Sequence, residues 1–270
     1  MKLQPEVTAV VTGAANGIGR ATAEALARRR VRVALVDVDE PRLAETADRL
    51  LTAGCHVSSH VADVADRAAI ADVAREIGAR YGSLEILINS AGVSLSGRFE
   101  ALRLDDIEWL MRTNFWGVVY SCHVFLPQLK SAPAAAIVNV LSQLALVAAP
   151  GKTAYCAAKF GVRGFSESLA SELAGSSVRV IRVYPGPVST SIVHRGRATD
   201  PETQRREAEF LAERGLAPSA VANAIVRAIE RDSSRVVVGW GTRALDVAGR
   251  ALPEFTRAGV AYVARRLGLV

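Results

Sequence analysis

Two side chains with complementary acid–base chemistry, Tyr155 and Lys159, stand four positions apart in the segment YCAAKFGVRGF. The segment is typical of a helix, where this spacing places both side chains on one face. A phenol with an ordinary pKa of about 10 is a weak base at neutral pH, but a neighbouring ammonium favours the phenolate. The pair therefore predicts that Tyr155 removes the proton of an alcohol, or donates a proton in the reverse reaction.

A third candidate lies thirteen residues before the tyrosine. Ser142 ends the apolar run AAIVNVLS (residues 135–142), which is typical of a buried strand. Ligands of open α/β sheets bind at the carboxyl ends of the strands, so the Ser142 hydroxyl is predicted to hold a substrate oxygen beside Tyr155. A serine that only begins a turn is the alternative interpretation.

A glycine-rich segment, TGAANGIG (residues 12–19), joins the first strand-like run to a helical pattern. Glycines permit a tight turn and a close approach of a diphosphate, and a helix N-terminus offers unpaired N–H groups and a positive dipole end. The spacing G-x3-G-x-G departs from the G-x-G-x-x-G fingerprint of dinucleotide sites, so a simple tight turn is the alternative. The candidate cofactor contacts in this segment are Gly13, Asn16, Gly17, Ile18 and Gly19.

One acid follows the glycines by about 20 residues, at the end of the second apolar run. Asp37 stands where a carboxylate binds both hydroxyls of an adenosine ribose. Its charge would repel a 2′-phosphate, and neither Asn16 nor Val38 is basic, so NAD is favoured over NADP. A solvated acid at a strand end is the alternative.

Apolar runs and helical patterns alternate along most of the chain. The expected strands span residues 7–12, 31–37, 56–63, 84–92, 135–142, 178–186 and 235–239. The expected helices span residues 17–29, 41–51, 66–82, 104–129, 153–175 and 220–232. This order predicts an α/β fold, a single-domain Rossmann-type doubly wound parallel sheet of about seven strands with helices on both faces.

No linker or repeat divides the chain, so residues 1–240 are predicted to form one dinucleotide-binding and catalytic domain. The charged residues 189–218, here called the insert, separate the last two strands and are expected to form a substrate lobe or lid. Residues 241–270 form a basic tail, expected to be helical and to pack on the domain or on a neighbouring subunit. Arg243, Arg250 and Arg257 recur every seven residues and predict one stripe on a helix, which makes a peripheral membrane contact the alternative.

The composition limits the remaining classes of function. The chain has 270 residues, 50% of them hydrophobic and 22% charged, which excludes a disordered or collagen-like protein. A net charge of +6 is spread over the whole chain, and no nucleic-acid motif accompanies it, so nucleic-acid binding is not expected. The three cysteines form no CxxC pair, His56 and His60 lie in a strand-like pattern, and no metal site is predicted. The N-terminus lacks the apolar core of a signal peptide, and a cytoplasmic location is expected.

The motifs together resemble the short-chain dehydrogenase/reductase family over roughly residues 5 to 240. The resemblance rests on TGAANGIG, Asp37, Asp63-Val64, NSAG (89–92), Asn114 in MRTNFWG, Ser142, YCAAK and PGPVST (185–190). It implies a catalytic tetrad that acts with a nicotinamide cofactor, formed by Asn114, Ser142, Tyr155 and Lys159. NSAG replaces the commoner NNAG and Ala158 stands where serine is frequent, and neither change touches a catalytic group.

The resemblance also implies further contacts with the cofactor. Tyr155 and Lys159 would adjoin the nicotinamide ribose, Asp63 and Val64 would border the adenine, and Asn114 would keep a water in a proton relay. The remaining implied contacts are Asn89, Ala91 and Gly92, which also stabilise the sheet, and Pro185, Gly186, Val188 and Thr190, which flank the nicotinamide amide.

The sequence thus predicts an NAD-dependent oxidoreductase that interconverts a secondary alcohol and a ketone by hydride transfer. A non-catalytic NAD-binding sensor or scaffold on the same fold is the rival reading. A hydrophobic small molecule is the expected substrate, given apolar residues that either face it or pack the loops: Val93, Leu95, Leu144, Leu146, Val147, Pro150 and Val188. His194, Arg195 and Arg197 could instead meet an anionic substrate or simply be solvated.

The family resemblance implies a homodimer or homotetramer. The expected contacts are made by the helical segments 104–130 and 152–174. Three residues are candidates for these contacts: Cys122, Phe125 and Phe165.

Overall fold

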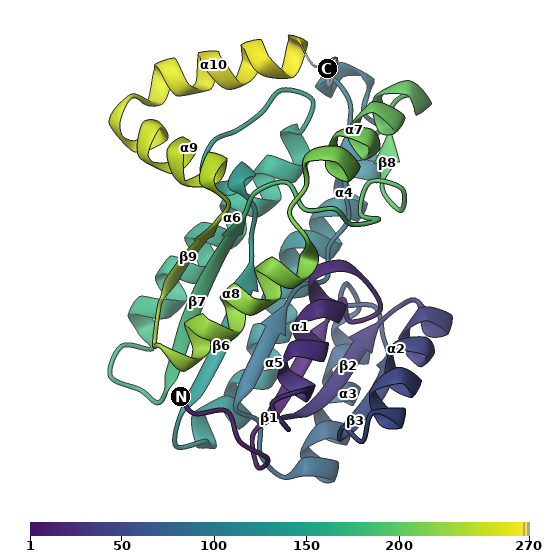
Figure 1. The fold of residues 1–270 in the computed structure, drawn as a ribbon, viewed down its shortest axis with the longest axis vertical. Coiled ribbons are helices and arrows are strands. Elements are labelled where there is room, and N and C mark those ends of the chain that lie inside the picture. The colour runs from purple at the N-terminus through teal and green to yellow at the C-terminus, as the bar shows by residue number, and fades with distance from the viewer. Residues whose placement is uncertain (267, 269–270) are drawn as a thin grey trace.

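A seven-stranded sheet forms the centre of the chain in a computed structural model that describes residues 1–266 and 268. Its strand order is β3-β2-β1-β4-β6-β7-β9, and every neighbouring pair is parallel (Figure 1). The strands are β1 (Thr8–Thr12), β2 (Arg32–Asp37), β3 (Val57–Val61), β4 (Ile86–Asn89), β6 (Ala135–Val140), β7 (Val178–Pro185) and β9 (Arg235–Val238). The predicted doubly wound parallel sheet is confirmed.

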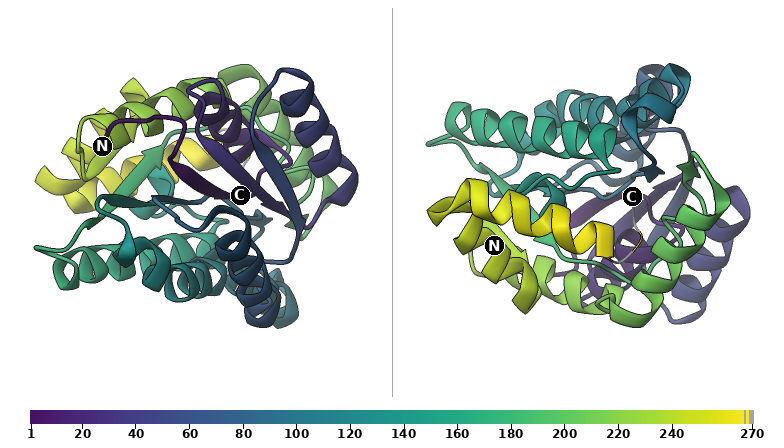
Figure 2. Two further views of the ribbon diagram at one scale, coloured as in Figure 1. Left: turned by 90° about the horizontal axis from the view of Figure 1, so that it is seen from below. Right: turned by 90° about the horizontal axis from the view of Figure 1, so that it is seen from above.

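Helices cover both faces of this sheet. The α-helices of the chain are α1 (Gly17–Ala27), α2 (Glu40–Thr52), α3 (Arg67–Tyr81), α4 (Leu104–Met111), α5 (Gly117–Ser131), α6 (Thr153–Glu172), α7 (Pro201–Arg214), α8 (Pro218–Glu230), α9 (Trp240–Ala251) and α10 (Pro253–Arg266). Helices α1, α2 and α8 lie on one face, and α3, α5 and α6 lie on the other (Figure 2).

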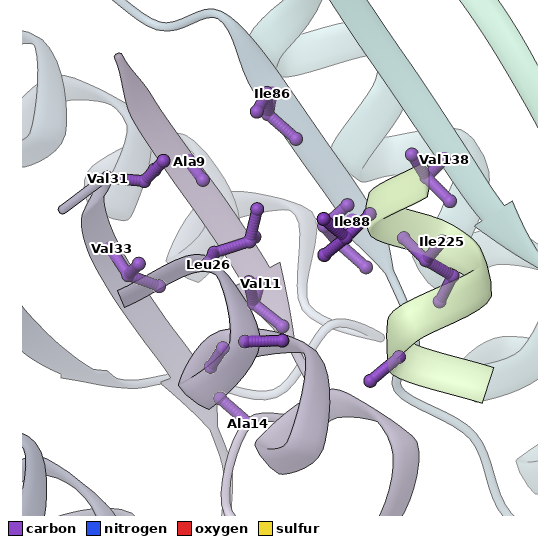
Figure 3. Close-up of a cluster of buried hydrophobic side chains, with 14 of the residues drawn as sticks. Ala9, Val11, Ala14, Leu26, Val31, Val33, Ile86, Ile88, Val138 and Ile225 are labelled. Carbon is purple, nitrogen blue, oxygen red and sulfur yellow. The ribbon is translucent and has the colours of Figure 1, made fainter. Parts of the chain in front are cut away.

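The near-continuous apolarity of the strands follows from these two layers, because successive side chains of a strand point to opposite faces. Ala9 and Val11 of β1 pack under α1 and α8, together with Leu26 and Ile225 (Figure 3). Val10, between them in sequence, packs on the opposite face with residues of α3, α5 and α6. Both sets of side chains are buried, so neither face of this central strand is exposed to solvent.

The strand register brings the carboxyl ends of four strands to one edge. Thr12 pairs with Val36 on one side and with Asn89 on the other, and Asn89 pairs with Asn139. The connections wind in opposite directions from β1 and β4, so a crevice opens between these strands at their carboxyl ends. Asp37 follows Val36 and therefore lies at the same edge.

The helix expected over residues 104–129 is interrupted. Helix α4 passes into a π-helix, Arg112–Trp116, and then into α5. The insert (residues 189–218) contains α7 and a short strand, β8 (Arg197–Ala198). Strand β8 pairs in parallel with β5 (Leu95–Ser96) to make a separate two-stranded sheet.

The C-terminal segment forms two helices rather than one. Pro253 begins α10, because proline has no N–H to donate to the preceding turn of a helix and is tolerated at the first position. Arg243 and Arg250 consequently share α9 while Arg257 lies on α10, and the predicted single stripe is wrong. Residues 267, 269 and 270 of the predicted tail lie outside the described residues.

Helix α9 is tied to the edge strand of the sheet by a buried ion pair. The Asp246 carboxylate, 7% exposed, accepts two hydrogen bonds from the Arg235 guanidinium of β9, at 2.6 and 3.0 Å. Arg250, one turn further along α9, also pairs with Asp246 at 3.2 Å.

In the described part of the chain, no helix is both long enough and apolar enough to cross a membrane.

Two residues expected at contacts between subunits are instead part of the core. Cys122 and Phe125 are 2% and 0% exposed and lie on the face of α5 that packs against the sheet. They share that face with Val118 and Leu129, which have helical spacing from them. Phe165 is only partly buried.

Candidate active site

A cleft of about 400 Å³ opens at the carboxyl edge of the sheet. Its walls come from the loop between β1 and α1, the ends of β2 and β4, the loop after β3, and the insert. Eleven residues predicted to contact a cofactor line it: Gly13, Asn16, Gly17, Ile18, Gly19, Asp37, Asp63, Val64, Ala91, Gly92 and Thr190.

The glycines of the first loop are required by close contacts. Gly13 has φ of +71°, and a Cβ there would lie 2.8 Å from the Ala91 backbone. A Cβ on Gly19 would lie 2.0 Å from the Gly13 carbonyl oxygen. Asn16 caps α1 by accepting from the Gly17 N–H at 2.7 Å, and the first residues of the helix, Gly17, Ile18 and Gly19, line the cleft.

Asp37 is held in place by the backbone on both sides. One of its carboxylate oxygens accepts from the Ala15 N–H at 3.0 Å, and the other accepts from the Asp39 N–H at 3.0 Å. These two bonds leave further lone pairs on each oxygen for a ligand. Val38, the next residue, is 64% exposed and lines the cleft, so no basic side chain stands beside the carboxylate at this position.

The end of β4 is fastened from below the cleft. The Thr12 hydroxyl oxygen accepts from the N–H groups of Ser90 and Ala91, both at 3.2 Å. The Asn89 side chain points into the core, where its Nδ2 donates to Asn139 Oδ1 at 2.8 Å and to Cys122 Sγ at 3.3 Å. Asn89 is therefore placed to hold the sheet edge together and does not line the cleft.

The predicted acid–base pair stands on α6. Tyr155 lies one turn before Lys159, and the Lys159 Nζ lies 5.8 Å from the centre of the tyrosine ring. Burial raises the pKa of Tyr155 to about 12, and a hydrogen bond with the Ser142 side chain opposes this shift. Ser142 lies just after β6 and accepts the Leu144 N–H at 3.1 Å, which fixes its side chain.

Lys159 is buried, and no acidic side chain in the described part of the chain pairs with it. Its side chain is 5% exposed, and its Nζ donates to the Val140 carbonyl oxygen at 3.1 Å. Burial lowers the pKa of this ammonium to about 8. Its charge therefore acts on the neighbouring phenol without neutralisation by an ion pair.

The π-helix brings Asn114 to the same region. The Asn114 Oδ1 accepts from the Val93 N–H at 2.8 Å, and its Nδ2 donates to the Val93 carbonyl at 2.9 Å. A Cβ on Gly92 would lie 3.3 Å from Asn114 Oδ1 and 3.8 Å from Lys159 Nζ, so the tetrad adjoins the wall of the cleft. Bulges of this kind occur frequently at functional sites.

The segment that follows β7 completes the site. Pro185 ends β7, and the Gly186 N–H donates to the Val238 carbonyl oxygen at 3.0 Å. Val188, just before the insert, is buried. Thr190 faces the cleft next to Gly17, where a Cβ on the glycine would lie 3.0 Å from the threonine methyl group.

Several lining residues had no sequence signal that would single them out. They are Ala62, Ser90, Trp109, Thr113, Ser191 and Ile192. Val38, Val93 and Arg195, which the sequence singled out for other reasons, also line the cleft. Among the residues expected to face a substrate, Leu95, Val147 and Val188 are less than 8% exposed and pack within the chain. Arg197 pairs with Asp106 at 2.6 Å and covers the Trp109 ring at 4.1 Å.

His60 and the three cysteines do not line the cleft. The His60 ring contacts the Ser58 hydroxyl and the Glu76 carboxylate, both at 2.9 Å. All three cysteines are free. Within residues 1–266 and 268, no three His, Cys, Asp or Glu side chains gather to hold a metal ion.

A comparison with known families decides what this arrangement represents. The family model described as short chain dehydrogenase matches residues 7–201. The chain belongs to the short-chain dehydrogenase/reductase family. The match includes the glycine loop, Asp37 and all four residues of the predicted tetrad.

Relatives within the short-chain dehydrogenase/reductase family share most of the chain. A Mycobacterium tuberculosis protein named "Putative oxidoreductase SadH" is 39% identical over 249 residues, which cover 90% of both chains. The D-threitol dehydrogenase of Mycolicibacterium smegmatis is 40% identical over 192 residues, 69% of this chain and 72% of that protein. A short-chain dehydrogenase/reductase from Burkholderia phymatum, solved in complex with NAD, superposes with a TM-score of 0.88 at 29% identity and covers 95% of this chain and 97% of its own.

Proposed function

We propose that this short-chain dehydrogenase/reductase is an NAD-dependent enzyme that interconverts a secondary alcohol and a ketone. Its substrate is a hydrophobic small molecule, which contacts apolar side chains of the loops. The proposal rests chiefly on one observation. A partly buried tyrosine next to Ser142, one helical turn from a buried lysine, stands beside a cleft that carries the glycine loop and Asp37. A relative solved with NAD and another named as a dehydrogenase of an alcohol support it.

The tetrad residues divide the proton chemistry between them. Ser142 holds the substrate oxygen and Tyr155 exchanges the proton with it, so the phenol acts as a base in oxidation and as an acid in reduction. The Lys159 ammonium favours the phenolate, against the burial that raises the pKa of Tyr155 to about 12. Asn114, fixed through both side-chain groups to Val93, positions the water that relays the proton.

The residues of the cleft fit a nicotinamide dinucleotide. The N–H groups of the glycine loop and of the α1 N-terminus would donate to its diphosphate. The Asp37 carboxylate would accept hydrogen bonds from the hydroxyls of its adenosine ribose. Asp63 and Val64 border the adenine, and Lys159 contacts the nicotinamide ribose. Ala91, Gly92 and Thr190 make further contacts from the wall of the cleft. Asn89 and Val188 support that wall from within the chain, and Pro185 and Gly186 adjoin it at and just after the end of β7. When bound, the nicotinamide supplies the group that accepts or donates the hydride.

Asp37 is the reason to favour NAD. Its two oxygens are oriented by backbone N–H groups before any ligand arrives, so little ordering is needed when a ribose binds. A 2′-phosphate would place two negative charges in contact at the same position. Relatives of similar fold are solved with NAD or with NADP, so the charge at position 37 of this chain is the deciding feature.

The cofactor preference can be measured with a panel of secondary alcohols and ketones, following the absorbance of the reduced nicotinamide. We expect turnover with NAD and a kcat/KM at least about 100-fold lower with NADP, because a hydrogen bond to a charged group is exchanged for a repulsion. Asp37→Ser should lower the ratio of kcat/KM with NAD to kcat/KM with NADP by about 10-fold or more.

Asp48→Asn is the matched control for this variant. Asp48 is exposed on α2, so the substitution removes the same charge away from the cleft and should leave the preference unchanged. A preference for NADP in the unmodified chain would contradict the role given to Asp37. Turnover with neither cofactor, combined with no binding of either, would contradict the proposed function as a whole.

A further inference from the structure

The insert lines the cleft through Thr190, Ser191, Ile192 and Arg195, which lie in and next to a hydrogen-bonded turn. The Asn16 Nδ2, at the cap of α1, donates to the Ser191 hydroxyl oxygen at 2.5 Å. The Arg195 N–H donates to the Ser191 carbonyl at 3.0 Å, so Arg195 stands one turn beyond Ser191. Both residues line the cleft. The insert therefore places an arginine next to the N-terminus of α1.

The guanidinium of this arginine is held at the other rim of the cleft. Its Nη2 donates to Asp39 Oδ2 at 2.6 Å. Asp39 itself caps α2 by accepting from the Arg42 N–H at 3.3 Å, and its own N–H donates to Asp37. Arg195 thus spans the space between the cap of α1 and the loop that carries Asp37.

The chemistry of this position favours a phosphate. A guanidinium carries five N–H donors in a planar fork that matches two phosphate oxygens. Among the described residues, Arg195 makes its one side-chain hydrogen bond to Asp39, so donors remain for a ligand. The α1 N-terminus binds anions through backbone N–H groups and its dipole, and a cation on the facing wall completes the enclosure.

We propose that Arg195 binds the diphosphate of the dinucleotide from the insert, opposite the N-terminus of α1, and that Asp39 holds the guanidinium ready for it. This role rests on the proposed function, since it requires a dinucleotide in the cleft. It assigns Arg195 to the cofactor rather than to an anionic substrate. It also makes the insert a part of the cofactor site.

Nucleotide fragments test the role without any turnover. Trp109 lines the cleft, so quenching of tryptophan fluorescence, checked by calorimetry, reports binding of ADP and of adenosine. We expect Arg195→Ala to weaken ADP binding by about 10- to 100-fold and to leave adenosine binding unchanged, because only ADP carries the diphosphate. Arg195→Lys should recover part of the loss, since it keeps the charge without the fork.

Two further variants separate this contact from general effects of charge. Arg205→Ala removes another arginine of the insert, which is exposed on α7 and pairs with Glu202 and Glu209, and should bind ADP as the unmodified chain does. Asp39→Asn keeps a cap for α2 but releases the guanidinium from its ion pair. Because it removes the group that positions the guanidinium, it should weaken ADP binding in the presence of Arg195, and less so in the Arg195→Ala background.

The outcomes are distinct. Equal ADP affinity in Arg195→Ala and in the unmodified chain would overturn the role of Arg195 while leaving the proposed function intact. A loss confined to 2′,5′-ADP, with ADP unaffected, would also overturn it, because the arginine would then face the ribose 2′ position. Failure of the unmodified chain to bind ADP or NAD at all would overturn the proposed cofactor, and this role with it.

Discussion

Tyr155→Phe is expected to lower kcat by about 10²- to 10⁴-fold, the usual contribution of a positioned acid–base group. The substitution removes one hydroxyl and keeps the ring, which packs beside Leu95 and Ala158. Without the Tyr155 hydroxyl, no group next to Ser142 accepts the proton of the alcohol. Affinity for NAD should change little, because the nucleotide contacts of the cleft come from other elements. Steady-state kinetics and calorimetry measure the two quantities separately.

Tyr81→Phe is the matched control for this loss. Tyr81 ends α3, before β4 begins, and thus lies toward the opposite edge of the sheet from the cleft. The substitution removes the same hydroxyl group away from the cleft and should leave kcat unchanged. A Tyr155→Phe variant that retains full turnover would contradict the proton chemistry assigned to this residue, whatever its affinity for NAD.

Lys159→Met is expected to shift the pH dependence of alcohol oxidation upward and to lower the rate at neutral pH by about 100-fold. A unit charge about 6 Å from the phenol, at an effective dielectric constant of about 20, contributes about 3 kcal/mol. This corresponds to about 2 pKa units, hence about 100-fold less phenolate at a pH below the pKa of Tyr155. Methionine retains the length of the buried stem and removes the charge, the donor to Val140 and the proposed contact with the nicotinamide ribose, so the pH profile rather than the rate alone reports the charge.

The direction with pH follows from the two shifted groups. Oxidation needs the phenolate, whose pKa burial raises, so its rate should rise with pH. The Lys159 ammonium, with its pKa lowered to about 8, loses its charge as the pH rises through that value, which should flatten the increase. Reduction needs the phenol and should fall as the pH rises. An oxidation profile that is the same in Lys159→Met and in the unmodified chain would contradict the electrostatic role of the lysine.

The sheet and the glycine loop could be predicted because their requirements are local. Strands covered on both faces must be apolar throughout, and a loop in which a Cβ at position 19 meets the Gly13 carbonyl must keep its glycine. Asp37 followed from its distance to that loop. The predicted tetrad lies together for the same reason, since Ser142 and Tyr155 are joined by a short connection that returns to the same edge.

Other features depend on contacts that spacing does not encode. The π-helix around Asn114 adds a residue to one turn, and a periodic pattern over residues 104–129 does not locate such an addition. Arg195 meets Asp39 across 156 residues of sequence, which no motif connects. Cys122 and Phe125 lie on the inner face of α5 because the sheet, rather than a second subunit, covers that face.

Transfer of deuterium tests the central claim most directly. The best secondary alcohol from the panel would be labelled at its carbinol carbon, and the mass of the reduced nicotinamide measured after a single turnover. We predict one deuterium in the reduced cofactor and none released to solvent, because the hydride passes directly between the two carbons while Tyr155 takes the proton. A cofactor that binds in the cleft but gains no label from any alcohol of the panel would contradict catalysis and identify a nucleotide-binding protein on the same fold.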